Sequence, residues 1–280
     1  MSKEKADSQD HRSFSNWCKQ FKAFYLRSIH EFLNSWSLIF IALGFAPFMY
    51  LVYNASLGSA PPTMKAGLSI GIGIFGSMIV CLYVFGNQLI IDLEDQRYET
   101  YRSMPMMPTA DLAGRLSAGI TISSVAFLTT VFIGLVTGAS YSVRGLNSIP
   151  VIIAAFAFSC VLWMIVSIPM VMTASNERYA ELLTTITAVI ATLITGNNGV
   201  MPEAAMVSEN LLNIIPNSLS TRVLSYHLIE GGAYTEAGLV PPAMPSGIES
   251  LGLLTVYGVV SALAGVMLVR KLHNKKVLPK

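Results

Sequence analysis

Charge is scarce in this sequence, and the scarcity narrows the possibilities. Only 12% of its 280 residues are Asp, Glu, Lys or Arg, about half of the roughly 25% that is usual in a soluble domain. By contrast, 53% are hydrophobic and the mean hydropathy is +0.57. This composition excludes a disordered chain, a coiled coil and an ordinary cytosolic enzyme. The net charge of +2 gives no indication of nucleic-acid binding. An integral membrane protein is predicted.

Residues that bind metals or nucleotides are also few. Cys18, Cys81 and Cys160 have no CxxC spacing and the four histidines are dispersed, so we expect no disulfide framework, no metal site and no catalytic residues. The GxxxxGKS/T pattern is missing, which excludes an ATP-binding P-loop in this chain. Gly71–Gly76 fits GxGxxG, but it lies inside an apolar run without a preceding strand. A dinucleotide site needs that strand. The overlapping Gly67-xxx-Gly71 pattern is better interpreted as close packing between helices or as a flexible stretch in lipid.

The sequence contains long apolar runs with few charged residues. A helix needs about 20 apolar residues to cross the hydrocarbon core, and six segments approach or reach that length, the fifth being short. They are Trp36–Tyr53, Ala66–Ile91, Leu116–Thr137, Val151–Thr173, Ala180–Gly196 and Ile248–Val269. The runs lack the alternation of barrel strands, and helices satisfy their own backbone in lipid. The predicted fold is an all-α integral membrane protein with six transmembrane helices in a domain of residues 36–270.

The basic residues predict the orientation. Fifteen of the eighteen Lys and Arg precede the first span or follow the second, fourth and sixth spans, whereas only Lys65, Arg144 and Arg222 fall on the other face. The positive-inside rule then predicts a multi-pass protein of the plasma membrane with both termini on the cytoplasmic side. Residues 271–280 form a basic cytoplasmic tail. The polar N-terminal tail gives no indication of a cleavable signal peptide.

Residues 1–35 combine that cytoplasmic tail with an amphipathic segment, Phe14–Leu33. One stripe of this segment follows helical spacing, while Lys19, Lys22 and Arg27 lie off it. The stripe consists of Phe14, Trp17, Phe21, Phe24, Tyr25, Ser28 and Phe32. An aromatic stripe beside basic residues is typical of a helix in the membrane interface. A soluble helix packed on another subunit is the alternative.

Two connecting segments are long. The cytoplasmic loop 92–115 mixes acidic residues, arginines, tyrosines and a Met-Pro run. We expect a short helix that the prolines end after Ser103. Such a surface suits docking to a partner protein, and a solvated connector fits the composition equally well. The external loop 197–247 is apolar and broken by prolines, which predicts helices that re-enter the membrane or lie at its surface.

The predicted spans hold few polar groups. No Asp, Glu, Lys, Arg or His lies in the middle of any span, which argues against proton coupling and against an acid–base or metal site inside the membrane. Asn87 and Gln88, near the inner end of the second span, either line a path or bond a neighbouring helix. Several span residues are aromatic, including Phe40, Phe45 and Tyr83. These rings suit an amphipathic cargo, although each alone is equally explained by lipid contact or packing.

Two motifs now suggest a family. Residues 92–105 read DLEDQRYETYRSMP and are followed by Leu112, Gly114 and Arg115. This resembles the D-x-E-x-G…F-R-S-L-P segment, then Leu and Gly-Arg, that follows the second span in membrane subunits of type-2 ABC exporters, most closely the daunorubicin-resistance branch. Gln96 replaces the usual glycine. Residues 199–217, from GVMP to IPN, are similar to the family's F-x-P…N-P element, with Asn and Pro reversed. The resemblance covers nearly the whole chain.

The resemblance implies a non-catalytic permease subunit. Such permeases form homodimers, or heterodimers with a sister permease, on two ATPase subunits that bind ATP and magnesium, and this chain itself would carry no cofactor. The loop after the second span would be the coupling helix, and the N-terminal helix would also touch the ATPase. The coupling residues carried over are Glu94, Asp95, Arg97, Tyr98, Tyr101 and Arg102. The path would form between copies, from spans one, two and five. Its candidate residues are Phe40, Phe45, Tyr83, Phe85 and Asn87.

The expected function is therefore that of an exporter permease worked by a separate ATPase. Its cargo is expected to be a small amphipathic drug-like or lipid-like molecule, with polysaccharide, glycolipid or peptide as alternatives. Membrane lipids are expected partners and nucleic acid is not. A stand-alone secondary carrier is the second hypothesis, and it predicts a broken-helix or ionisable site and an internal repeat. A membrane-embedded enzyme would need convergent polar residues, which the sequence does not display.

Overall fold

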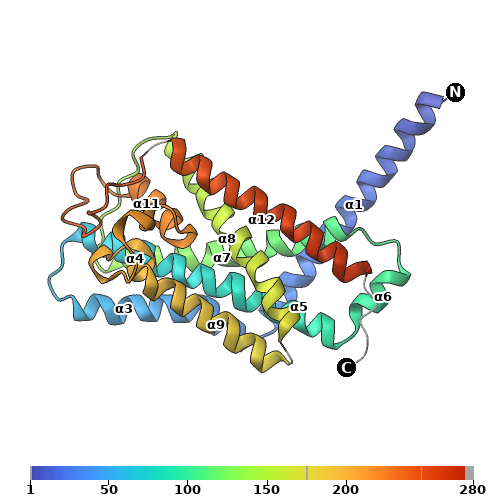
Figure 1. The fold of residues 1–280 in the computed structure, drawn as a ribbon, viewed down its shortest axis with the longest axis horizontal. Coiled ribbons are helices and arrows are strands. Elements are labelled where there is room, and N and C mark those ends of the chain that lie inside the picture. The colour runs from blue at the N-terminus through green and yellow to red at the C-terminus, as the bar shows by residue number, and fades with distance from the viewer. Residues whose placement is uncertain (1, 175, 247, 275–280) are drawn as a thin grey trace.

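The computed structural model describes residues 2–174, 176–246 and 248–274 (Figure 1). All regular secondary structure in these ranges is helical, without a strand. The main helices are α1 (Ser2–Leu33), α2 (Trp36–Ile39), α3 (Ala46–Ser56), α4 (Pro62–Ile79), α5 (Phe85–Glu94), α6 (Arg97–Ser103), α7 (Pro108–Val136), α8 (Ser148–Thr173), α9 (Glu177–Ile194), α11 (Pro216–Leu228) and α12 (Ile248–Asn274). Two π-helical segments, η1 (Phe40–Phe45) and η2 (Val80–Val84), join some of them. Most of the predicted C-terminal tail, residues 275–280, lies outside the described residues.

Five helices in the described part are long and apolar enough to cross a membrane. Two are composite: α2, η1 and α3 form a first rod, Trp36–Ser56, and α4, η2 and α5 form a second rod, Pro62–Glu94. The others are α7, α8 and Glu249–Leu272 of α12. Five of the six predicted spans are thereby confirmed as membrane-length apolar helices, and the architecture is that of a multi-pass helical membrane protein.

The remaining predicted span, Ala180–Gly196, corresponds to α9, which differs from the other five. Its 18 residues begin with Glu177, Arg178 and Glu181 within the first turn and a half, so it is shorter and more polar. Asn176 caps its start by accepting a hydrogen bond from the Tyr179 amide at 2.9 Å. The helix runs antiparallel beside the second rod (Figure 1).

The second rod is the centre of the bundle. In its most apolar 18-residue stretch 94% of the residues are buried, against 22 to 56% in the other four long helices. Helices α3, α7, α8 and α9 contact it. Its largest fully buried side chains are Leu68, Ile70, Ile72, Ile74, Met78, Leu82 and Leu89. The surrounding helices therefore cover the second rod and expose their own outer faces, as expected where lipid and not water is the solvent.

Glycines allow this close packing. A Cβ atom on Gly76 would overlap the side chain of Ala46 in the first rod, and one on Gly71 would overlap Val200. Close packing thus occurs at Gly71, the second glycine of the Gly67-xxx-Gly71 pattern, and at Gly76, where the two rods touch.

Substituting Gly76 by leucine is expected to lower the apparent melting temperature of the purified protein by several degrees. The added side chain has to push the first rod away from the second, and overpacking of this kind costs about 1–3 kcal/mol. Gly252→Leu is the matched control, because nothing lies within 4 Å of a Cβ placed there. Equal melting temperatures for the two variants would contradict the packing.

Helix α7 begins earlier than hydropathy predicts. The predicted span starts at Leu116, but the helix starts at Pro108, whose fixed φ and missing N–H suit a first helical position. Asp111 and Arg115 fall in this additional stretch, and both are buried. Hydropathy leaves these two charged residues outside the predicted span. In the fold they lie inside the helix, where they form an ion pair with each other at 2.5 Å.

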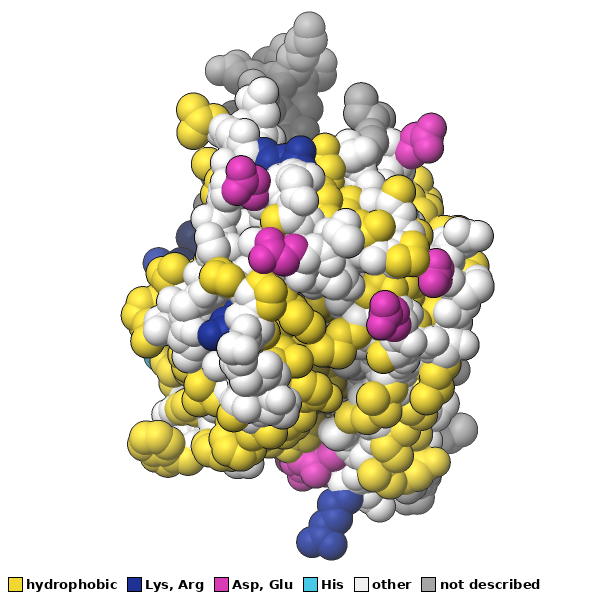
Figure 2. Space-filling view, turned by 90° about the vertical axis from the view of Figure 1, so that its left-hand side faces the viewer, with side chains coloured by type: hydrophobic (Ala, Val, Ile, Leu, Met, Phe, Trp, Pro, Cys, Tyr) yellow, Lys and Arg dark blue, Asp and Glu magenta, His cyan; other side chains and the backbone are white. Residues whose placement is uncertain are grey.

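The two ends of the bundle differ. We call them the α6 end and the α11 end; α12 finishes near α6, and α11 packs on α8 and α4 at the opposite end (Figure 1). Figure 2 looks onto the α11 end, where acidic side chains are scattered over an apolar surface. Exposed residues there include Glu203, Glu209, Glu230 and Glu236. The predicted helices of loop 197–247 exist, and the largest, α11, is buried along Asn217–Ser225.

Arg222 holds the α11 end together. Its side chain is fully buried and donates to the backbone carbonyls of Gly199 (3.1 Å), Leu239 (2.9 Å) and Pro242 (2.7 Å) and to the Asn213 side chain (2.8 Å). Burial lowers the pKa of Arg222 to about 10, so the guanidinium stays protonated at neutral pH. It satisfies a carbonyl at the end of the short helix α10 (Gly196–Gly199) and two in the irregular segment that contains Leu239 and Pro242.

Candidate functional sites

A buried carboxylate lies near the end of the second rod. Asp92 is 0% exposed, and three arginines from three other helices converge on it. Arg27 of α1 and Arg115 of α7 form ion pairs with it, and Arg97 of α6 lies 2.9 Å from its Oδ1. Asp92 therefore joins α1, α5, α6 and α7 at one point.

Further carboxylates complete this group, which we call the Asp92 cluster: Asp92, Arg27, Arg97, Arg115, Glu31 and Asp111. Glu31 accepts from Arg27 at 2.8 Å and from Arg97 at 3.2 Å. Although burial disfavours the charged form of Arg27, the neighbouring Asp92 raises the pKa of Arg27 above its ordinary value. Each buried charge thus has opposite charge beside it, as a stable buried ion pair requires.

Helix α1 packs lengthwise on α7 through the predicted aromatic stripe. A Cβ on Gly114 of α7 would lie 2.7 Å from both the Phe21 carbonyl and the Phe24 Cβ. The guanidinium of Arg115 lies 5.6 Å from the centre of the Phe24 ring. Gln20 accepts from the Met107 amide at 2.8 Å. Most of the stripe is therefore covered by a helix of the same chain, whereas Phe14 at its start is 68% exposed.

The predicted coupling residues have different environments. Glu94 and Asp95 are exposed, and Arg97 is occupied within the Asp92 cluster. Tyr98 is buried at 2% exposure, and Tyr101 contacts it edge-on with ring centres 5.6 Å apart. The side chain of Arg102 lies outside the described residues. The outward surface of this segment includes Glu94, Asp95, Glu99, Thr100, Ser103 and Met104.

Sequence reasoning did not identify Asp92, Arg27 and Arg115 as one site. Asp92 and Arg115 did belong to the motif that carried the family resemblance, and this was the available signal. Arg27 was assigned to the basic face of an interfacial helix, because spacing within one helix does not show which other helix its side chain meets. The cluster forms only when α1, α5 and α7 come together.

A second feature is a lateral groove between the first rod, the second rod and α9. Its volume is about 450 Å³. It is lined by Ile41, Phe45, Ile79, Tyr83, Arg178, Glu181, Leu182, Thr185 and Val189. Two predicted path residues, Phe45 and Tyr83, share this groove. Phe40, at 70% exposure, and the buried Phe85 do not line it.

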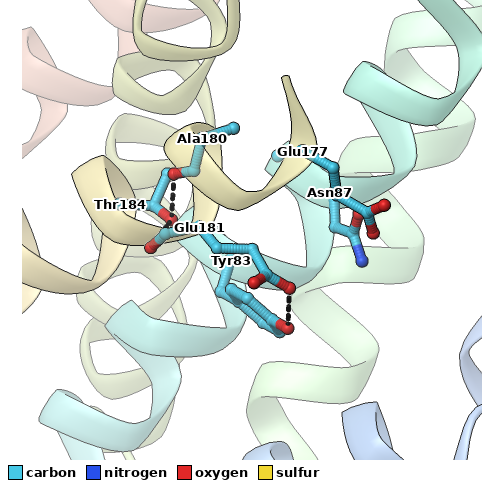
Figure 3. Close-up of a pocket in the computed structure, with 7 residues that line it drawn as sticks. Tyr83, Asn87, Glu177, Ala180, Glu181 and Thr184 are labelled. Carbon is cyan, nitrogen blue, oxygen red and sulfur yellow. Dashed lines mark hydrogen bonds between the residues drawn. The ribbon is translucent and has the colours of Figure 1, made fainter. Parts of the chain in front are cut away.

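A polar recess adjoins the groove at Tyr83 and Glu181 (Figure 3). The Tyr83 hydroxyl donates to the Glu181 carboxylate at 2.5 Å. Asn87 also lines the recess, and its buried Oδ1 has no hydrogen-bond partner in the described part of the chain. Gln88 instead donates to the Ser28 carbonyl of α1 at 2.9 Å. Of the two interpretations of this pair, packing therefore applies to Gln88, whereas Asn87 faces the recess.

No protein-family model matches the sequence, and no curated protein matches it. Among the described residues, no group of three or more His, Cys, Asp or Glu side chains is arranged to hold a metal ion. The two features to be explained are thus the Asp92 cluster at one end and the groove along the side.

Proposed function

We propose that the chain is the membrane-spanning, non-catalytic permease subunit of an ATP-driven exporter of the type-2 ABC class, with α6 as its coupling helix. The observation that carries the proposal is the Asp92 cluster. Because Asp92 binds arginines of α1, α6 and α7 together, a force on α6 would move all these helices as one unit. A short helix braced in this way is suited to receive a mechanical input from outside the membrane.

In this proposal α9 also crosses the membrane, as the fifth of six spans in chain order, and the α6 end lies on the cytoplasmic side of a plasma membrane. An 18-residue helix extends about 27 Å, close to the roughly 30 Å of the hydrocarbon core, and α9 returns the chain from the α6 end to the α11 end. The concentration of basic residues at the α6 end supports the orientation.

The energy source has to be another chain, because the sequence has no P-loop and no ionisable residue midway along its spans. The outward surface beside α6 carries Glu94, Asp95 and Glu99. Met104 lies on the same surface and is about half exposed. Acidic side chains around an exposed methionine suit a groove with basic walls and an apolar floor. Two ATPase copies closing on ATP would then bias two arrangements of a permease dimer.

The cargo is proposed to be a small amphipathic molecule, with polysaccharide, glycolipid or peptide as alternatives. The lateral groove supports the amphipathic cargo, because its walls are mostly apolar and its polar groups gather at one corner. It also lies where the first and second rods meet α9, the three elements that would face a second copy.

Coupling is tested with charge reversals on the outward surface. The chain is co-expressed with an ATPase encoded beside it, and Glu94→Lys with Glu99→Lys is expected to abolish co-purification and permease-dependent ATP hydrolysis. Neither side chain belongs to the Asp92 cluster, so the melting temperature should not change. Glu203→Lys with Glu236→Lys, equally exposed at the α11 end, is the matched control. Full ATP hydrolysis by the first variant would overturn the docking assignment.

One observation favours the second candidate, a stand-alone secondary carrier. The helix after α9 is broken, since Gly196, Asn197, Asn198 and Gly199 all have positive φ, between 54° and 79°. Broken helices often hold ions in secondary carriers. Purified chain in vesicles without any ATPase would move a solute along an ion gradient if this candidate were right, and it would be inert under the exporter proposal.

A further inference from the structure

The groove contains a carboxylate without a counter-charge. Asp92 and Asp111, the buried carboxylates of the bundle, are both paired with arginine. Glu181 is half-buried in the wall of the groove, and its partner within the described chain is the neutral Tyr83 hydroxyl. Arg178 also lines the groove, but it is exposed and forms no ion pair with Glu181.

A carboxylate without a counter-charge in a mostly apolar groove is costly and is often functional. The start of α9 does not remove this cost, because the helix dipole stabilises anions mainly within the first turn. Glu177 occupies that turn, whereas Glu181 lies one turn further on. The Tyr83 hydroxyl supplies one hydrogen bond, while a carboxylate accepts several. Glu181 therefore has both charge and hydrogen-bonding capacity left for an occupant of the groove.

The surroundings of Glu181 also favour a positively charged donor. Asn87 presents a buried Oδ1 without a partner to the adjoining recess, and this oxygen can only accept. Glu177 lines the same recess, and its side chain extends toward Asn87 (Figure 3). Two aromatic rings, Phe45 and Tyr83, line the groove, and aromatic faces attract cations.

The volume of the groove and its apolar walls suit the apolar part of a molecule that carries a positively charged donor. About 450 Å³ falls within the range of small-molecule sites, and Ile41, Leu182 and Val189 supply apolar surface. Both π-helical segments contribute to the walls, η1 through Ile41 and Phe45 and η2 through Tyr83. Such segments cost stability and are frequent at functional sites.

We propose that the groove binds an amphipathic cation, with its protonated amine at Glu181 and its apolar body along Ile41, Phe45 and Leu182. The binding site is inferred from this chain alone. Only the further step, that such a cation is the exported cargo, rests on the proposed function.

The test uses the purified full chain in nanodiscs of phosphatidylcholine, without an ATPase. Binding of tritiated dodecylamine is measured by scintillation proximity, and empty nanodiscs correct for partitioning into lipid. Unlabelled dodecylamine is expected to displace the probe, whereas dodecyl sulfate, with the same chain and opposite charge, is not. Glu181→Gln is expected to weaken binding at least tenfold, or about 1.4 kcal/mol.

Two further variants separate charge from folding. Glu181→Asp keeps the carboxylate and should retain more binding than Glu181→Gln at a similar melting temperature. Glu203→Gln, an exposed position at the α11 end, should bind as the parent does. Unchanged binding by Glu181→Gln, or equal displacement by dodecyl sulfate, would overturn the inference. Neither result affects ATPase docking at α6, and a failure of that docking would leave cation binding intact.

Discussion

Replacing Asp92 by alanine is expected to lower the free energy of unfolding by about 3–5 kcal/mol, the range found when one partner of a buried ion pair is removed. Asp92 is 0% exposed and contacts Arg27, Arg97 and Arg115. Its loss leaves three guanidinium groups close together, balanced by the flanking Glu31, Asp95 and Asp111. Unfolding in mixed micelles, followed by circular dichroism, measures the change.

The matched control is Asp95→Ala. Asp95 also binds Arg97, at 2.8 Å, but its side chain is 52% exposed. Exposed ion pairs contribute at most about 1 kcal/mol, so this variant should unfold almost as the parent does. If Asp92→Ala and Asp95→Ala were equally stable, the Asp92 cluster would not hold the four helices together. The proposal that it transmits force from α6 would then be contradicted.

A milder variant addresses the function more directly. Asp92→Asn keeps the shape of the side chain and removes the charge that attracts the three arginines. In the proposed exporter this should loosen α6 from α1 and α7, so that ATP hydrolysis continues while transport falls. Parallel loss of both activities would instead indicate that the cluster serves folding alone.

The sequence predicted the apolar helices well, because the mean hydropathy of some 20 consecutive residues can be calculated from that stretch alone. It could not say which face of each helix is buried. In a soluble protein polar residues mark the outer face, but in lipid both faces are apolar. Phe40 and Phe85 illustrate the difficulty: similar rings in similar runs are exposed in one case and buried in the other. Only the contacts between helices distinguish them.

Charges misled the sequence reasoning in a consistent way. Arg115 was left outside the span predicted to start at Leu116, and Arg27 was placed on the basic face of an interfacial helix. The charges of α9 shortened its apolar run. In each case the side chain lies where another segment supplies a partner or a groove: Arg115 and Arg27 at Asp92, and Glu181 at Tyr83. Such partners lie dozens of residues apart, so no local pattern reveals them. The charged residues that broke the hydropathy pattern are therefore the ones that mark both candidate sites.

Replacing Arg222 by methionine is expected to unfold the α11 end locally while the α6 end stays folded. Methionine fills similar space but donates no hydrogen bond, so the carbonyls of Gly199, Leu239 and Pro242 lose their partner. A buried polar group left unsatisfied costs about 1–3 kcal/mol, which gives at least about 3 kcal/mol for the three. Hydrogen exchange read by mass spectrometry should show faster exchange in residues 196–243.

Arg144→Met is the control at the same end of the bundle. Arg144 is exposed, and its side chain donates to the Tyr226 carbonyl at 2.7 Å and to the Tyr234 hydroxyl. Any faster exchange after its loss should therefore be confined to residues 226–234, and exchange in residues 196–225 should stay unchanged. Arg222→Lys should give an intermediate result, because an ammonium group keeps the charge but not the planar fork that reaches several carbonyls. Unaltered exchange in Arg222→Met would mean that the left-handed turn after α9 is held by Asn198 and Asn217 instead, whose side chains bond each other at 2.8 Å.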